Sequence, residues 1–382
     1  MAQAATEIAY LDPENGQTYP LDEPRWSGPG RRPLLLTKRE GIGRAEIETG
    51  VRSLWRYRAV LPLPRAVPIS MGEGMTPLVA RTIGGADALV KCEWVTPTGS
   101  FKDRGASVML SLLRAQGIGA VLEDSSGNGG AAIAAYAAAG GMAATILAPA
   151  ATSPAKLVAM RAHGAQVELV PGDRQATAEA ALRKSESIFY ASHNWHPFFL
   201  EGTKTLAYEL WEELGFRAPD NVIVPCGAGS NVLGLAIGFG ELLRAGEIEK
   251  MPRIFAVQPE NCGPIAAAFA AGSEAKVANV VRPTIAEGTA IAHPVRFGTV
   301  LQCLRESGGG AIALSEVEIA EATLALARMG LFVEPTAAQP GAGFRRLMEA
   351  GKIAAGETTV LVLTGSGLKA GARIAEILEA KP

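Results

Sequence analysis

The sequence has little of what metal-binding and disulfide-stabilised proteins need. Its 382 residues contain only four cysteines, Cys92, Cys226, Cys262 and Cys303, and no C-x-x-C spacing. A zinc site or a disulfide framework is therefore not expected, and we predict no metal. The same scarcity of cysteine favours a reducing, cytoplasmic environment.

Charge of one sign and long apolar runs are also missing. The net charge is −2, so nothing indicates nucleic acid or an anionic membrane as a partner. The longest apolar stretch, 131–149, is interrupted by Gly140 and Gly141, which is typical of a buried helix and strand and not of a membrane span. The first residues lack a basic segment followed by an apolar one, so no signal peptide is expected.

What is present is a core-rich globular chain. Hydrophobic residues make up 48% and charged residues 19%, and the length fits two domains or one large domain with an insertion. Short apolar segments alternate with helical patterns, which predicts an α/β fold with doubly wound, mostly parallel sheets. The predicted strands include 119–123, 145–147, 166–170, 222–224 and 359–363.

One lysine stands where α/β proteins bind ligands. Residues 97–105 read P-T-G-S-F-K-D-R-G, so that a turn and a capping serine, Ser100, precede Lys102 in the first turn of a predicted helix. A strand end at 88–90 lies just upstream, which puts Lys102 at a strand–loop–helix junction. Desolvation and positive potential can lower the pKa of such a lysine and let its amine attack an aldehyde. The alternative is a solvated lysine at a helix start.

Two later loops are candidate anion sites. Residues 125–130 read S-S-G-N-G-G before a predicted helix at 131–139, and residues 227–231 read G-A-G-S-N before one at 232–244. Free backbone N–H groups at a helix start attract anions, and small residues let the backbone wrap around them. Either loop could be an ordinary glycine-rich turn, and the second could suit a dinucleotide. However, the strand expected at 254–257 ends in Gln258, without the acidic partner that a ribose requires.

Taken together, these motifs resemble those of the fold-type II pyridoxal 5′-phosphate (PLP) enzymes, and most closely those of threonine synthases. The likeness extends to G-E-G-M-T-P-L at 72–78, E-P-T-A-A at 334–338 and T-G-S-G-L-K at 364–369. It implies two doubly wound, mostly parallel domains with the cofactor in the cleft between them. Residues 1–104 and 201–382 would form a large PLP-binding domain with an N-terminal arm, and 105–200 a smaller, mobile domain for the substrate carboxylate. It also implies a homodimer.

The resemblance assigns roles to single residues. Lys102 would bind the PLP aldehyde and later accept the α-proton, Asn128 would lie near the 3′-oxygen, and the hydroxyl of Thr364, with Ser366 as second choice, would face the pyridine nitrogen. A hydroxyl at that nitrogen favours loss of a leaving group over transamination. The implied cofactor-binding residues are Lys102, Asn128, Gly227, Ala228, Gly229, Ser230, Asn231 and Thr364. The implied substrate-binding residues are Ser125, Ser126, Gly127, Gly129, Thr76, His193 and Arg296.

The chain departs from threonine synthases where those enzymes grip the phosphate of their substrate. The family segment N-S-x-N-x-x-R-[LI]-E-G-x-K-T reads H-N-W-H-P-F-F-L-E-G-T-K-T at 193–205, so Phe199 stands at the arginine position. Gly129 replaces a threonine and Ala228 an asparagine. Each charge-assisted donor contributes about 1.5–3 kcal/mol to phosphate binding, so losing several together disfavours a phosphorylated substrate. His193, His196 and Arg296 are the candidates for compensation.

The sequence therefore predicts a PLP-dependent lyase that acts on an L-amino acid by elimination or replacement at Cβ or Cγ, with an altered phosphate site. Its substrate would carry no phosphate, or another anion such as a carboxylate. Two alternatives stay open. One is an authentic threonine synthase, which converts O-phospho-L-homoserine to L-threonine and phosphate. The other is a non-catalytic PLP-binding protein.

Overall fold

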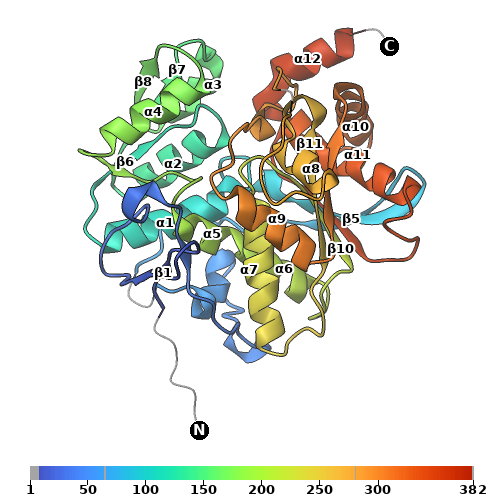
Figure 1. Cartoon of the computed structure of the whole chain (residues 1–382), viewed down its shortest axis with the longest axis horizontal. Helices are drawn as coiled ribbons and strands as arrows, with labels where there is room; N and C mark the ends of the chain where they lie inside the picture. Colours follow the sequence, from blue (N-terminus) through green and yellow to red (C-terminus); the bar gives the residue numbers. More distant parts are fainter. Residues whose placement is uncertain (1–7, 64–65, 280, 381–382) are drawn as a thin grey trace. The chain divides into compact units, whose positions relative to one another are not determined.

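The chain forms two compact units, each built from segments that are distant in sequence. A computed structural model describes residues 8–63, 66–279 and 281–380 (Figure 1). The described residues of Met1–Glu73 and Lys102–Thr205 form unit 1, and those of Gly74–Phe101 and Leu206–Pro382 form unit 2. The described residues of 1–73 thus group with 102–205. The division into a PLP-binding domain and a mobile substrate domain stays a prediction.

Unit 1 contains a four-stranded parallel sheet in the order β8-β7-β6-β9. Its strands are β6 (Ala120–Glu123), β7 (Ala143–Pro149), β8 (Gln166–Val170) and β9 (Phe189–Tyr190). Its helices are α1 (Lys102–Ala115), α2 (Asn128–Ala139), α3 (Pro154–Ala162), α4 (Arg174–Lys184) and α5 (Pro197–Thr203). The alanine-rich α2 is buried almost throughout. Alanine suits this place because it has the highest helix propensity and its small side chain lets neighbouring elements approach closely.

The N-terminal segment packs onto this unit. A small antiparallel sheet joins β1 (Tyr10–Leu11) to β2 (Thr18–Tyr19) and β3 (Leu35–Leu36), and β1 and β2 form a hairpin whose turn contains Gly16, where φ is +73°. A 3₁₀ helix, η3 (Leu54–Val60), follows and is interrupted at Tyr57. Tyr10, Leu54 and Trp55 share one apolar core with α1 and α2.

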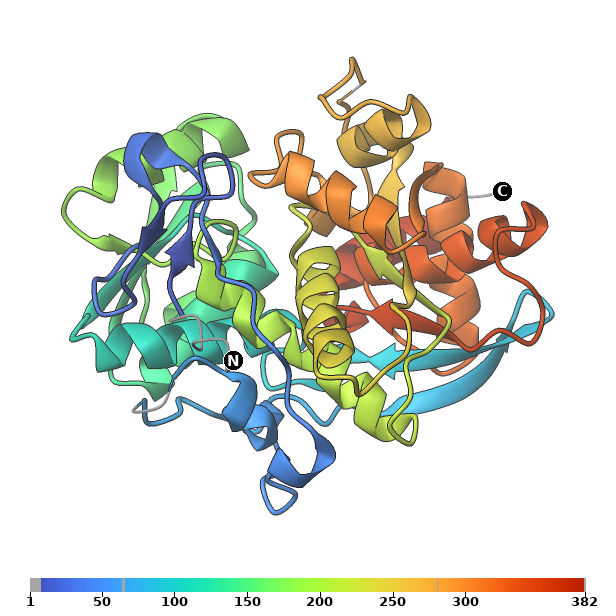
Figure 2. The same cartoon turned by 60° about the horizontal axis from the view of Figure 1, so that its bottom comes forward.

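Unit 2 contains a six-stranded sheet in the order β12-β11-β10-β13-β5-β4 (Figure 2). Its strands are β4 (Leu78–Ile83), β5 (Ala86–Cys92), β10 (Asn221–Pro225), β11 (Arg253–Pro259), β12 (Gly310–Leu314) and β13 (Thr359–Leu363). All neighbours pair in parallel except β4 and β5. Together with the sheet of unit 1, this confirms the predicted α/β fold with mostly parallel sheets.

Helices cover this second sheet. They are α6 (Thr205–Glu213), α7 (Ser230–Arg244), α8 (Pro264–Ala270), α9 (Phe297–Glu306), α10 (Glu316–Arg328), α11 (Pro335–Glu349) and α12 (Gly371–Glu379). The short 3₁₀ helices of both units are η1 (Pro29–Arg31), η2 (Arg44–Glu46), η4 (Glu93–Val95), η5 (Glu260–Cys262), η6 (Glu287–Thr289) and η7 (Gly367–Ala370).

Within unit 2, helices α7 and α9 lie side by side in Figures 1 and 2. In the described parts of the chain we find no helical segment with the length and hydropathy of a membrane span.

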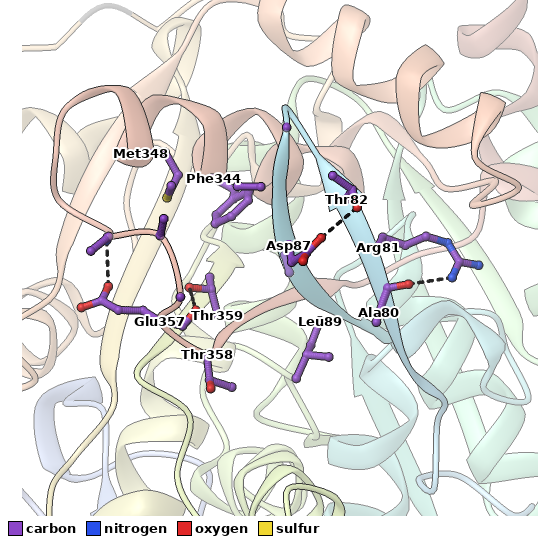
Figure 3. Close-up of a pocket in the computed structure, with 16 residues that line it drawn as sticks. Ala80, Arg81, Thr82, Asp87, Leu89, Phe344, Met348, Glu357, Thr358 and Thr359 are labelled. Atoms are coloured by element: carbon purple, nitrogen blue, oxygen red, sulfur yellow. Dashed lines mark hydrogen bonds between the residues drawn. The ribbon is translucent and has the colours of Figure 1, made fainter.

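A pocket of about 800 Å³ lies on unit 2 (Figure 3). Its wall combines Asp87 and Leu89 of β5, Phe344 and Met348 of α11, and the loop 354–359 that leads into β13. It therefore lies where β5 and β13 begin. The glycine-rich loops follow the opposite, carboxyl ends of the parallel strands, which is where such sheets bind their ligands. This pocket is thus not part of the candidate site.

Candidate active site

Lys102 is half-buried and is the first residue of α1, as the sequence predicted. Helix α5 packs against α1 with almost no space between their backbones. A Cβ atom at Gly202 would overlap the carbonyl oxygen of Arg104, and one at Gly105 would lie 2.5 Å from the ring of Phe199. This close packing puts the Phe199 ring beside the lysine, with Nζ 5.4 Å from the ring centroid. At the position where the resembling family has an arginine, the lysine thus meets an aromatic face.

The loop Ser125–Gly129 follows β6 and opens into α2, which begins at Asn128, three residues earlier than predicted. No side chain caps this helix start at Gly127, which is exposed. A Cβ atom at Gly130 would overlap the carbonyl oxygen of Ser125, so the turn requires glycine there. A helix start without a side-chain cap is a place where backbone N–H groups can face an anion, and that this loop binds one stays a prediction.

His193 lies against this loop and is held by a residue that the sequence analysis missed. Its Nδ1 is 3.0 and 3.1 Å from the two carboxylate oxygens of Glu123, which also accept the backbone N–H groups of His193 and Asp124. A Cβ atom at Gly129 would lie 2.7 Å from the imidazole ring. His193 thus fills the space of the side chain that Gly129 lacks. Its ring also meets Phe199 edge-on, with the centroids 5.7 Å apart.

Burial shifts the pKa values around this pair. Desolvation raises the pKa of the Glu123 carboxyl above its ordinary value and lowers that of His193 well below it, and the nearby charge of Lys102 lowers it further. Desolvation, with the neighbouring Glu123, raises the pKa of Asp124 to about 6. Both pKa shifts disfavour a charged carboxylate–imidazolium pair. They favour a neutral carboxyl group beside a neutral imidazole ring.

The other polar residues of the segment 193–205 stabilise the fold. His196 is buried and caps α5, because its Nδ1 accepts the N–H of Phe198 at 3.2 Å. Lys204 pairs with Glu201 at 2.6 Å and donates to the carbonyl of Val60, and Arg39 also pairs with Glu201. Of the two histidines considered as phosphate ligands, His196 therefore has a capping role.

In unit 2, the loop 227–231 connects β10 to α7 and forms a narrow cradle. Gly229 has φ +92°, and a Cβ atom there would overlap Val300 of α9. Among the described residues, the N–H groups of Gly227, Ala228 and Gly229 find no acceptor in the protein. Oδ1 of the buried Asn231 likewise finds no partner in the described part of the chain. The free N–H groups and the helix start fit a bound phosphate group, whereas the Asn231 oxygen, which is an acceptor, adds no hydrogen bond to it.

The motif around Thr364 lies beside the segment that precedes Lys102. Phe101 donates its N–H to the carbonyl of Thr364, and Ser366 donates to that of Gly99, both at 3.0 Å. The ammonium group of Lys369 lies 2.6 Å from the carbonyl of Thr98. Two motifs more than 260 residues apart in sequence thus form one structure. That the hydroxyl of Thr364, which is buried, faces a pyridine nitrogen stays a prediction.

Thr76 is held by a buried charged cluster that the sequence did not indicate. Its hydroxyl donates to Glu93 at 2.6 Å, and its N–H donates to Glu209 at 2.8 Å. Glu209 pairs in turn with the fully buried ammonium group of Lys91 at 2.6 Å. The Thr76 side chain is therefore used within unit 2, and its predicted contact with substrate would come from the backbone of this loop.

Arg296 is buried at the start of α9, and burial lowers its pKa to about 10. It therefore keeps its charge at neutral pH. The segment 334–338 also lies in this unit, where the N–H of Glu334 donates to Gly365 and the hydroxyl of Thr336 accepts the N–H of Gly288. Among the described residues no group of three or more metal-ligating side chains occurs.

The structure thus brings the predicted residues together in two sets. Unit 1 joins Lys102, the loop Ser125–Gly129 and His193 through Phe199, and unit 2 carries the cradle 227–231, Thr364, Thr76 and Arg296. Glu123 could have been suspected from the sequence, because it is an acidic residue at the end of a buried strand. Its pairing with a histidine 70 residues later carries no sequence signal.

Comparison with known proteins identifies the family of this chain. Residues 69–365 match the family described as "Pyridoxal-phosphate dependent enzyme". Threonine synthase of Methanosarcina acetivorans is 34% identical over 346 residues, or 88% of this chain and 85% of that protein. Threonine synthase of Methanocaldococcus jannaschii is 35% identical over 325 residues, or 83% of this chain and 80% of that protein.

Solved structures show the same fold. An L-serine ammonia-lyase from Rhizomucor miehei superimposes with a TM-score of 0.69 at 21% identity, covering 80% of this chain and 98% of that one. The processed threonine deaminase isoform 2 from Solanum lycopersicum gives 0.68 at 22% identity, covering 99% of this chain and 98% of that one. These findings confirm the predicted cofactor, PLP, and the predicted enzyme class. The chain belongs to the family of pyridoxal-phosphate dependent enzymes.

Proposed function

We propose that this PLP-dependent lyase catalyses elimination or replacement at Cβ or Cγ of an L-amino acid that carries no phosphate. The observation that carries the proposal is the surroundings of Lys102. Phe199, and not an arginine, lies against its ammonium group, and the neighbouring His193 has a lowered pKa and so carries little positive charge. A phosphate dianion needs several charged donors, and neither Phe199 nor the uncharged His193 is one.

The described residues fit the cofactor and a small amino acid. PLP would be held by Lys102, by the cradle 227–231 through its phosphate, and by Asn128 and Thr364 at its ring. When bound, PLP supplies an electron sink for the reacting carbon. The start of α2, with Ser125, Ser126, Gly127 and Gly129, would bind the substrate carboxylate. The amine of Lys102 would accept the α-proton, and the Phe199 ring would exclude water from it.

An authentic threonine synthase is the second candidate. The relatives with that name cover most of the chain, and the buried, charged Arg296 is a possible ligand for the phosphate of O-phospho-L-homoserine. A non-catalytic PLP-binding protein is the third candidate. It is disfavoured because such a protein needs no carboxylate site beside its lysine. A homodimer in the cytoplasm, with a mobile domain at 105–200, completes the proposal by likeness to the family.

Steady-state assays with O-phospho-L-homoserine, L-serine and L-threonine would test the proposal. We expect keto acid and ammonia from a hydroxy amino acid, with kcat/KM at least tenfold above that for threonine formation from O-phospho-L-homoserine. Rapid threonine release from the phosphorylated substrate would contradict the altered phosphate site. A yellow protein whose spectrum no amino acid changes would indicate the non-catalytic alternative.

The lysine can be tested separately by borohydride reduction and peptide mass spectrometry. In the wild-type protein the reduced cofactor should be attached at Lys102. Lys102→Ala should abolish the adduct, whereas Lys352→Ala, at an exposed position of unit 2, should leave it intact. An adduct on another lysine would contradict the assignment.

A further inference from the structure

Glu123 and His193 form a buried pair of titratable groups beside the proposed substrate site, with Asp124, Lys102 and Arg174 as their charged neighbours. Both carboxylate oxygens lie within 3.1 Å of Nδ1, and both residues are at least 94% buried, since Glu123 is 0% and His193 6% exposed. The backbone N–H groups of Asp124 and His193 fix the carboxylate, so that its orientation does not depend on the imidazole ring. The pair is therefore a rigid unit whose imidazole ring has a set direction.

The neighbours of the ring show what it faces. One edge lies against Gly129, at the start of α2, and the ring meets Phe199, whose own face contacts the Lys102 ammonium group. A substrate with its carboxylate at the start of α2 and its α-carbon at Lys102 would have its side chain beside His193. A side chain on residue 129 would overlap the His193 ring, so the position of this ring requires glycine at 129.

We propose that His193 is a catalytic residue that protonates the departing hydroxyl group of the substrate, and that Glu123 is the positioning residue that supplies the replacement proton. This inference deepens the proposed function and rests on it. It assigns the substrate class as amino acids with a free hydroxyl group at Cβ or Cγ, such as L-serine, L-threonine or L-homoserine. Such a group leaves poorly as hydroxide and needs an acid, which phosphate as a leaving group does not.

For a β-hydroxyl substrate, the protons and electrons balance as follows. In the reactive form the Glu123 carboxyl group is protonated and donates to Nδ1, which leaves the proton of the neutral ring on Nε2. Lys102 accepts the α-proton, the electron pair of the Cα–H bond forms the Cα–Cβ double bond, and the Cβ–O bond breaks. The oxygen takes the Nε2 proton and leaves as water, while Nδ1 takes the proton of Glu123. Hydrolysis of the released enamine, through its imine, then yields the keto acid and ammonia.

The burial of both groups supports this protonation state. Desolvation raises the pKa of Glu123 and lowers that of His193, so the proton shared by the pair is favoured on the carboxyl side. An uncharged imidazole with a proton on Nε2 can donate to a hydroxyl oxygen without attracting a dianion. The same pair thus supports the reaction and disfavours a phosphorylated substrate.

Three variants of the holoenzyme test the proposal. His193→Asn removes the acid. Glu123→Gln offers Nδ1 a donor through its amide, at the loss of one of the two backbone hydrogen bonds to the carboxylate, but cannot release a proton. His163→Asn, at an exposed position of the same unit, is the control. With L-serine we expect elimination to fall at least 100-fold in the first two variants and to stay unchanged in the control. Exchange of the α-proton in D₂O should continue, because it depends on Lys102.

A substrate that needs no acid separates catalysis from folding. Chloride leaves 3-chloro-L-alanine unprotonated, so we expect His193→Asn and Glu123→Gln to lose less than tenfold with it. Equal losses with L-serine and 3-chloro-L-alanine, or no loss with either, would overturn the proposal while leaving the lyase function intact. If the wild-type enzyme uses only O-phospho-L-homoserine, the proposed function fails and the inference fails with it.

A readout independent of turnover is the tautomer of the ring in the protein without cofactor. Nitrogen-15 NMR of histidine-labelled protein, assigned with His193→Asn, should show a protonated Nε2 and a bare Nδ1. Glu123→Gln should keep that pattern, because its amide still donates to Nδ1. A protonated Nδ1 with a bare Nε2 in the wild type would overturn the assignment of His193 as the acid.

Discussion

The His193 ring occupies the space that a side chain at position 129 would need, so these two residues constrain each other. We predict that Gly129→Thr, which introduces the residue found in threonine synthases, destabilises the protein by about 1–3 kcal/mol, because its side chain overlaps the imidazole ring. Urea unfolding measures the change. The double variant Gly129→Thr, His193→Ala should recover part of the loss. Equal destabilisation in the single and double variants would contradict the shared space.

Asp124 gives a residue-scale prediction about pH. Its pKa is about 6 in the folded protein and ordinarily 3.8, so between these values the unfolded chain loses its proton first and stability falls as the pH rises. Above pH 6 the loss is complete and amounts to roughly 3 kcal/mol. Asp124→Asn should remove it and still accept the hydrogen bond from Tyr190.

Urea unfolding of wild type and Asp124→Asn at several pH values between 4.5 and 8 would measure this effect. The variant should be the more stable protein at pH 7.5, and its advantage should shrink as the pH falls toward 4.5. A difference that does not change with pH would show that the asparagine acts through packing instead of charge.

At the scale of elements, the contact between α1 and α5 depends on a glycine. Gly202→Ala should cost about 3 kcal/mol, because the new Cβ atom meets a backbone oxygen of Arg104 that no side-chain rotation can move. Gly298→Ala, near the start of α9, is the matched control. Nothing lies within 4 Å of its Cβ position, so it should be neutral or slightly stabilising. Thermal unfolding compares the two, and similar shifts would contradict the close approach.

Sequence patterns predicted elements well where local chemistry decides. The strands expected at 166–170 and 359–363 match β8 and β13 residue for residue. Helix α2 begins earlier than predicted because Asn128, Gly129 and Gly130 are poor helix formers that are helical here through their surroundings. Helix α5 was missed because all its residues are buried, so no polar face gives it a period.

The candidate site also contains residues that the sequence predicts and residues that only the fold reveals. Lys102 and the two glycine-rich loops could be recognised because each is a short motif with a local reason for its residues. The pairs Glu123–His193 and Lys91–Glu209 join residues 70 and 118 positions apart, and only the folded chain brings them together. The residues that orient the site are therefore less predictable than those that carry its chemistry.

At the scale of the whole molecule, neither compact unit is one continuous segment. We predict that residues 105–200 expressed alone do not unfold cooperatively, because Tyr10, Leu54 and Trp55 complete the core of their unit. Co-expression of 1–73 with 102–205 should restore a cooperative transition measured by circular dichroism. A sharp transition of 105–200 alone would support the domain boundary expected from the sequence.

The order of strands in unit 2 also bears on how the chain is made. Strand β13 pairs with both β10 and β5 in the middle of the sheet, yet Thr359, where β13 begins, stands 134 positions after Pro225, where β10 ends. A ribosome must translate β13 before this sheet can close, whereas every described segment of unit 1 has emerged earlier. Until β13 emerges, the nascent polypeptide therefore exposes the unpaired edges of β10 and β5, which are places for a chaperone to bind.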